Sequence, residues 1–306
     1  MRIVSLLPAA TEILFELGLE ADVVGVSHEC DHPTEAVTRP RVTHSRIEDR
    51  GSSADIDEQV ARGEPGEPIY AIDEELLAAL APDLVVTQET CRVCAVDAGQ
   101  VESAALSLEH PPKILALQGE SLDGVLADIQ RVADAAGRPE AGKRLVRDAK
   151  RRIDRVTKIT GRLEAGPTVA AIEWLEPLMT SGHWVPELVR MAGGQPVPAP
   201  AEGPSRKIAW ERIVEADPQF LIVAPCGFTV GRTLEELDVL TKRPGWDRLM
   251  AVRRGNVYVA ESAYFTRPGP RLIDALEILA QLLHPRVFPG LIQVTENEVY
   301  RLQPVA

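Results

Sequence analysis

Residues 140–162, EAGKRLVRDAKRRIDRVTKITGR, predict one long amphipathic helix that decides how the rest of the chain is organised. Apolar residues recur there every three or four positions and form one stripe, while lysines and arginines fill the other faces. The stripe consists of Ala141, Leu145, Ala149, Ile153 and Val156. These 23 residues would span about 35 Å as a helix. A rigid helix of that length can join two lobes.

The sequences on either side of this helix repeat one order of elements. Residues 73–91, DEELLAALAPDLVVTQETC, and residues 210–227, WERIVEADPQFLIVAPCG, each indicate a helix, a turn with proline, a buried strand and a loop with cysteine. Strands that alternate with helices are typical of parallel sheets covered on both faces. We therefore predict an α/β fold of two lobes, 1–138 and 165–306, with mainly parallel sheets flanked by helices and joined by a linking helix at 139–164. Between the strands predicted at 22–26 and 84–87, the sequence GSSADIDEQV predicts a short helix capped by Ser53.

Composition narrows the classes of function. The chain has 306 residues, more than one hydrophobic core usually serves, and its net charge is 33 − 46 = −13. An acidic surface argues against a nucleic-acid partner, and we interpret the basic side chains of residues 140–162 as a solvated helix face. No stretch approaches 18 uninterrupted apolar residues, so we expect no membrane insertion. We expect a monomer.

The first residues, MRIVSLLPAATEIL, carry an apolar run that Pro8 and Glu12 interrupt, which is too short for a secretory signal. Four cysteines are too few for a disulfide scaffold in a chain of this length. The sequence as written therefore indicates a reduced cytoplasmic protein. Removal of a signal peptide would instead make it periplasmic or extracellular.

Chemically distinctive residues are concentrated where the predicted strands end, in SHECDH, TQETCRVC, WLEPLMTSGHW, APCGF and ESAYFTRPGP. In open parallel sheets, ligands bind beyond the carboxyl ends of the strands. Thiolate and imidazole ligands would favour zinc, iron or cobalt. We therefore consider three roles for the cysteines: incidental burial, contact with a metal or cofactor, and redox chemistry. The candidate metal ligands are Cys30, Cys91, Cys94 and Cys226.

Two motifs suggest enzymes but lie in the wrong context. His28 and His32 form H-E-x-x-H, yet the motif follows a strand and Pro33 disfavours the helix that a zinc peptidase needs. Gly137 to Lys143 match G-x-x-x-x-G-K, yet a helix precedes them and Arg144 stands where a phosphate loop needs Ser or Thr. A thiol- or metal-dependent enzyme that uses the Cys and His loops remains the alternative to a binding protein.

Four segments resemble the cobalamin- and iron-siderophore-type substrate-binding proteins of ABC importers, in the cobalamin-binding branch. They are RIVSLLPAATEILFELG, VVGVSHECDHP, LAPDLVVTQETCRVCAV and RPGPRLIDALEILA. The resemblance implies a non-catalytic protein that holds a cobalamin-like or iron-chelate ligand between two lobes, has no obligatory cofactor and has an ABC permease as its partner. It also implies ligand contacts at His28, Glu29, Gln88, Glu89, Trp174, His183, Trp184, Phe228, Tyr264 and Arg267. The strand-end argument adds Cys30 and Cys91.

Overall fold

The structure is a computed structural model that describes residues 1–62, 69–89, 96, 98–199 and 203–303. Contacts between Cα atoms divide it into two compact units. Unit 1 comprises Met1–Gly51, Glu58–Ala149 and Pro268–Pro270, and unit 2 comprises Ser52–Asp57, Lys150–Arg267 and Arg271–Ala306. Each unit is described by itself below.

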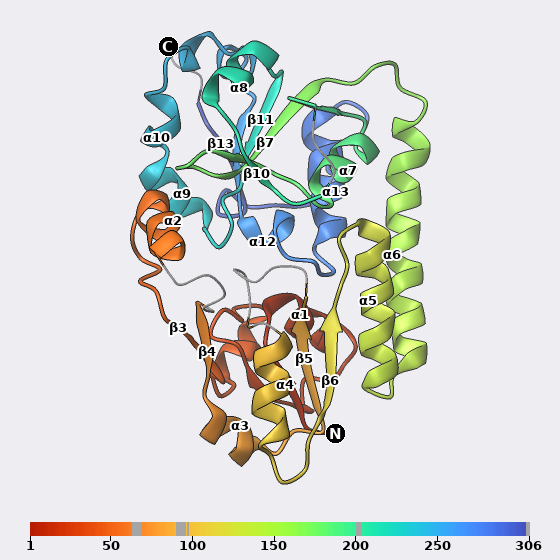
Figure 1. Cartoon of the computed structure of the whole chain (residues 1–306). Helices are drawn as coiled ribbons and strands as arrows, with labels where there is room; N and C mark the ends of the chain where they lie inside the picture. The colour runs from red at the N-terminus through yellow and green to blue at the C-terminus, as the bar shows by residue number, and fades with distance from the viewer. Residues whose placement is uncertain (63–68, 90–95, 97, 200–202, 304–306) are drawn as a thin grey trace. The chain divides into compact units, whose positions relative to one another are not determined.

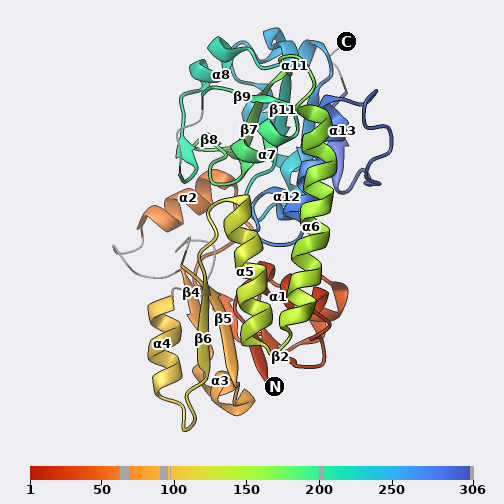
Figure 2. The ribbon, with the colours of Figure 1, turned by 90° about the vertical axis from the view of Figure 1, so that its right-hand side faces the viewer.

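In its described residues, unit 1 contains a four-stranded parallel sheet with the order β2-β1-β5-β6. The strands are β1 (Ile3–Ser5), β2 (Val23–Val26), β5 (Leu84–Gln88) and β6 (Lys113–Leu117). Strands β1 and β5 are buried at every position, as expected for strands covered on both faces. Figure 2 shows α4 (Ala98–Leu106) on one side of the sheet and α1 (Pro8–Glu16) and α5 (Leu122–Ala135) on the other.

Smaller elements complete unit 1. Helix α3 (Glu74–Leu80) precedes β5, and the 3-10 turn η1 (Thr34–Thr38) follows β2. Strands β3 (Thr43–Ser45) and β4 (Tyr70–Ile72) form an antiparallel ribbon. Gly25 allows β2 to approach its neighbours, because a Cβ there would lie 2.6 Å from Leu80 and 2.7 Å from Val42. Leu80 of α3 and Val42, the residue before β3, thus pack closely against β2.

Unit 2 contains a mixed sheet with the order β10-β8-β7-β11-β12-β13, and β9 also pairs with β7. Strands β7 (Thr168–Trp174), β11 (Phe220–Val223) and β12 (Val257–Ala260) are parallel, and their carboxyl ends meet at one edge. The remaining strands are short: β8 (Met179–Thr180), β9 (Gln195–Pro196), β10 (Arg206–Lys207) and β13 (Val299–Arg301). The connecting helices, labelled in Figure 1 where there is room, are α7 (Val185–Met191), α8 (Trp210–Ala216), α9 (Val230–Glu236), α10 (Asp238–Thr241), α11 (Met250–Arg253), α12 (Ser262–Phe265) and α13 (Leu272–Leu283), with the turn η2 (Trp246–Arg248).

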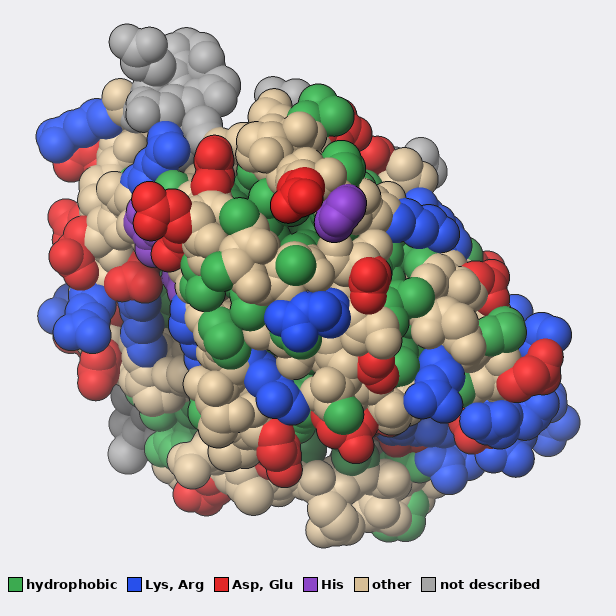
Figure 3. Space-filling view, turned by 90° about the horizontal axis from the view of Figure 1, so that it is seen from below, with side chains coloured by type: hydrophobic (Ala, Val, Ile, Leu, Met, Phe, Trp, Pro, Cys, Tyr) green, Lys and Arg blue, Asp and Glu red, His purple; other side chains and the backbone are tan. Residues whose placement is uncertain are grey.

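The long helix α6 spans Pro139–Thr160, and the division between the units falls within it, after Ala149. Ala149, Ile153 and Val156 of the predicted stripe are at most 9% exposed, whereas Lys143, Arg144 and Arg147 are exposed. Basic side chains gather at the right-hand edge of Figure 3, on the side where Figure 1 places α6. The predicted amphipathic helix is therefore confirmed. None of the helices in the described part of the chain is long and apolar enough to cross a membrane.

The predicted duplication reappears in the backbone of the helix-to-strand turns. Ala81 ends α3 with φ 40° and ψ 62°, and Asp217 ends α8 with φ 39° and ψ 63°. Each residue directly precedes the proline of its turn, and β5 and β11 then enter the middle of their sheets. Left-handed backbone is costly for residues with a Cβ, so its recurrence at both positions marks the same turn built twice. The α/β class with parallel strands flanked by helices is confirmed.

Candidate functional site

In unit 1, the antiparallel ribbon holds His28 at the end of β2. The Nδ1 atom of His28 lies 2.7 Å from the hydroxyl of Thr43 on β3, which also accepts the His28 backbone N–H at 3.1 Å. The imidazole centroid lies 5.0 Å from the ring of Tyr70 on β4. Burial lowers the pKa of His28, which favours the neutral ring. Its buried Nε2 atom has no hydrogen-bond partner among the described residues, and Oε1 of Glu29 lies 3.4 Å away.

Gln88 and Glu89 occupy the end of β5 in the same unit. Gln88 is 5% exposed, whereas Glu89 is exposed and accepts a hydrogen bond of 2.8 Å from the amide of Gln118. The carboxylate of Glu89 is therefore placed at the surface, where β5 and β6 end.

The cysteines lie in different surroundings. Cys30 is fully buried in unit 1, with its sulfur 3.0 Å from the hydroxyl of Thr11, and Cys226 is partly exposed in unit 2. Cys91 and Cys94 lie outside the described residues. No group of three His, Cys, Asp or Glu side chains that could hold a metal ion occurs among the residues the structure describes. Coordination shared by the four cysteines stays a prediction.

In unit 2, Trp174 and Phe228 meet where β7 and β11 end. Their ring centroids are 5.3 Å apart in an edge-on arrangement, and the guanidinium carbon of Arg232 lies 3.8 Å from the centroid of Phe228. Phe228 is only 2% exposed, and Trp174 is half-buried. The indole N–H of Trp174 donates to the carbonyls of Glu176 at 3.1 Å and Ser53 at 3.2 Å. Because its N–H is already engaged, Trp174 has its ring, rather than a hydrogen-bond donor, available for further contacts.

The loop between β8 and α7 carries His183 and Trp184. Their rings stack at 5.4 Å, and the indole N–H of Trp184 donates to the Phe265 carbonyl at 2.6 Å. His183 adopts φ 50°, a left-handed conformation that is rare for a residue with a side chain. Its backbone N–H donates to the Gly203 carbonyl at 2.7 Å. The loop is therefore held against residues 203–205.

Glu173 and Ser205 link the end of β7 to the loop between β8 and α7. The Ser205 hydroxyl donates to its carboxylate at 2.6 Å, and Ser205 in turn accepts the N–H of Gly182 at 3.0 Å. Burial raises the pKa of Glu173, and the hydrogen bonds that it accepts oppose that shift. Sequence reasoning missed Glu173 because a single glutamate within a strand carries no periodic signal.

Tyr264 and Arg267 lie after β12. The Tyr264 hydroxyl donates to Glu298 at 2.6 Å, and the guanidinium of Arg271 lies 5.5 Å from the ring centroid. Burial raises the pKa of Tyr264, and this hydrogen bond lowers the pKa of Glu298. Tyr264 is 8% exposed and Arg267 is half-buried. Tyr264 thus has its hydroxyl fixed at the end of the strand.

Comparison with known proteins assigns the chain to a family. The family described as periplasmic binding protein matches residues 3–264, which is most of the sequence. The chain belongs to the periplasmic binding protein family.

The relatives of this periplasmic binding protein span nearly its whole length. A vitamin B12-binding protein of Vibrio cholerae is 25% identical over 291 residues, covering 90% of this chain and 86% of that protein. The ABC transporter substrate-binding lipoprotein YvrC of Bacillus subtilis, which is itself uncharacterized, is 25% identical over 293 residues, covering 94% of this chain and 81% of that protein. A periplasmic heme-binding protein from Pseudomonas aeruginosa shares the fold, with a TM-score of 0.75, 19% identity and coverage of 100% and 99% of the two chains.

Family membership confirms two predictions from the sequence. The protein is a substrate-binding protein, and its role is non-catalytic. The alternative of a thiol- or metal-dependent enzyme has no support among these relatives.

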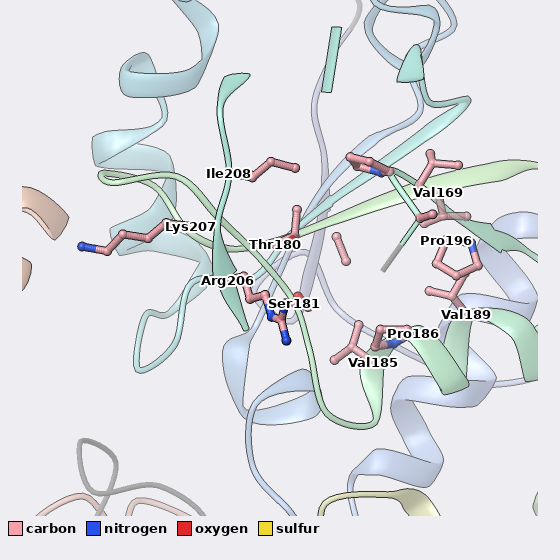
Figure 4. A pocket seen from close by; sticks show the side chains of 14 residues that line it. Val169, Thr180, Ser181, Val185, Pro186, Val189, Pro196, Arg206, Lys207 and Ile208 are labelled. Atoms are coloured by element: carbon pink, nitrogen blue, oxygen red, sulfur yellow. The ribbon is translucent and has the colours of Figure 1, made fainter. Parts of the chain in front are cut away.

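Figure 4 shows a pocket in unit 2 whose lining includes none of the ligand contacts predicted in this unit. Val169 at the start of β7, Val185 and Val189 of α7 and Pro196 of β9 line it, and Arg206 lies at its rim. Its volume of about 190 Å³ is below the 300–1,000 Å³ of typical ligand pockets. Because this pocket is smaller than a typical ligand pocket, we keep the residues at the strand ends as the candidate site.

Proposed function

We propose that this periplasmic binding protein captures a cobalamin-like or iron-chelate ligand and presents it to the permease of an ABC importer. The proposal extends to the chain what the names of its relatives state for them: vitamin B12 and heme as ligands, and an ABC transporter as the partner. It places the protein outside the cytoplasmic membrane, as a periplasmic or lipid-anchored protein. The relatives give no support to the cytoplasmic interpretation of the sequence.

The observation that carries the choice of ligand is the half-buried indole of Trp174. Its N–H is engaged by two carbonyls, so its remaining surface is an apolar ring face suited to a flat macrocycle. Trp184 and Tyr264 have their polar atoms engaged in the same way, at the Phe265 carbonyl and at Glu298. Trp184 is 5% exposed and Tyr264 8% exposed, so among these three aromatic residues Trp174 has the most ring surface for stacking on a ligand.

His28 supports a ligand that contains a metal. An imidazole kept neutral by burial, with one nitrogen fixed at Thr43, is the form that ligates metal ions. We propose that His28 contacts the chelate, together with Glu29, Gln88 and Glu89 of the same unit. Arg267 in unit 2 supplies a cation for the carboxylates or phosphate of such ligands.

Visible absorption spectra test this proposal. Addition of haem or aquocobalamin to the protein should shift the ligand's absorption bands, and His28→Ala should abolish or alter that shift. His32→Ala is the matched control, because His32 is an exposed histidine of the same loop. Identical spectra for all three proteins would exclude His28 as a contact, and unshifted bands with the unmodified protein would contradict the choice of ligand.

A further inference from the structure

The first turn of α2 (Ser53–Arg62) is fastened inside unit 2 by a carboxylate that lies far away in sequence. Both carboxylate oxygens of Glu236, the last residue of α9, accept the backbone N–H of Ser53, at 2.9 and 3.0 Å. The hydroxyl of Ser53 also donates to Glu236. A carboxylate at a helix N-terminus satisfies free N–H groups and complements the helix dipole. Ser53 was predicted to cap α2 with its own side chain, but Glu236 accepts both its N–H and its hydroxyl.

The same serine holds Trp174. Its carbonyl accepts the indole N–H at 3.2 Å, and its hydroxyl oxygen accepts the backbone N–H of Glu176 at 3.1 Å. Ser53 is fully buried. A second bond, from Lys207 to Asp57 at 3.1 Å, fastens the next turn of the helix to β10. We call Ser53 and Glu236 the clasp.

The clasp determines how the indole of Trp174 is oriented. The ring can rotate about two side-chain bonds, and its edge-on contact with Phe228 restricts that rotation. The bonds from its N–H to the carbonyls of Ser53 and Glu176 restrict it further. Without the Glu236 carboxylate, Ser53 loses the acceptor of its N–H and of its hydroxyl, and the carbonyl that accepts the Trp174 N–H is held by fewer bonds.

We propose that Ser53 and Glu236 are positioning residues for Trp174 and thereby set the affinity of the site for its ligand. This inference rests on the proposed function, in which Trp174 stacks on the ligand. It assigns a binding role to residues of α2 and α9 that neither the relatives nor the sequence motifs indicate.

The test compares Glu236→Gln with Glu235→Gln, an exposed neighbour on the same helix. The emission of Trp174 is isolated by subtracting that of a Trp174→Phe protein, since Trp184, Trp210 and Trp246 are 4–5% exposed. Glu236→Gln should shift the Trp174 emission to the red and increase its quenching by acrylamide. Glu235→Gln should leave both unchanged. Unchanged Trp174 emission in Glu236→Gln would overturn the proposal.

Binding of haem and cyanocobalamin is measured on the same proteins. Loss of a charge-assisted hydrogen bond should weaken binding about tenfold in Glu236→Gln, with no change in Glu235→Gln. Ser53→Ala, which keeps the carbonyl that Trp174 needs, should give a smaller loss, and this separates positioning from misfolding. If the unmodified protein binds neither ligand, the proposed function fails, while the emission result still decides whether the clasp holds Trp174. Equal affinity in all variants would exclude the effect on binding.

Discussion

Replacing Glu277 by glutamine should destabilise unit 2, because Glu277 joins α13 to the second half of α6. Its carboxylate accepts hydrogen bonds from Arg152 at 3.1 and 2.6 Å and from Arg155 at 2.5 Å, and Arg152 also donates to Asp274 at 2.5 Å. Burial alone would raise the pKa of Glu277, but the bonds from the two arginines hold that pKa below its ordinary value. Glutamine has nearly the same shape and lacks the charge.

The expected loss of stability in Glu277→Gln depends on how exposed its two arginine partners are. Removing one member of a buried ion pair costs about 3–5 kcal/mol. Here the side chain of Glu277 is 4% exposed, but those of Arg152 and Arg155 are 37% and 54% exposed and can turn to water. We therefore discount the loss to about 2 kcal/mol. For a unit of about 160 residues, this corresponds to a fall in Tm of about 4–8 °C.

Differential scanning calorimetry and urea unfolding at pH 7 measure the loss. Glu215→Gln is the control, since the Arg212–Glu215 pair is 64% exposed on both sides and its loss should cost at most about 0.5 kcal/mol. The pKa of Glu277 is lowered in the folded state, so its contribution is present above the unfolded-state pKa and disappears as pH falls through the folded-state pKa. The gap between wild type and Glu277→Gln should therefore narrow in acid. A variant as stable as wild type at pH 7, or a gap that widens in acid, would refute this reasoning.

Two further substitutions test the fold. Ile153→Pro in α6 should cost at least about 3 kcal/mol of stability, because proline breaks the helix and Ile153 is 9% exposed. Calorimetry should show both units destabilised together. An unchanged transition for one unit would show that α6 is not shared. For Glu173, burial raises the pKa, so the folded protein binds the proton more tightly than the unfolded chain. Wild type should lose stability relative to Glu173→Gln as pH rises above the unfolded-state pKa of about 4.3, until the folded-state pKa is passed. Urea midpoints that differ by the same amount from pH 4 to pH 8 would contradict that assignment.

Periodic and repeated features of the fold could be predicted from the sequence. Helix α6 follows from the spacing of Ala149, Ile153 and Val156, and the turn that recurs before Pro82 and Pro218 follows from the repeated order of helix, proline and strand. These signals are local, since each depends on residues that a single element brings onto one face. The resemblance to the substrate-binding proteins was carried by four sequence segments, and the family match over residues 3–264 confirms it.

The contacts that shape the candidate site could not be predicted, because they join residues with no local relation. Ser53 and Glu236 are 183 positions apart, and nothing in the sequence near Glu236 indicates that it caps a helix of the first half. Thr43 and Tyr70 lie on short ribbon strands within a weakly patterned region, so the support of His28 was missed. Trp174 was found through its place at a strand end, but its engaged N–H required the structure.

Isothermal titration calorimetry with cyanocobalamin, haem and a ferric siderophore tests the central claim most directly. We expect saturable binding of at least one of these ligands, at one ligand per protein and with a Kd below about 10 μM. This Kd corresponds to a binding free energy of about −7 kcal/mol or better. Glu235→Gln should bind as tightly as wild type, and Trp174→Ala should bind more weakly. Absence of binding by all three ligands up to about 1 mM, where the binding free energy is only about −4 kcal/mol, would contradict the proposed ligand class.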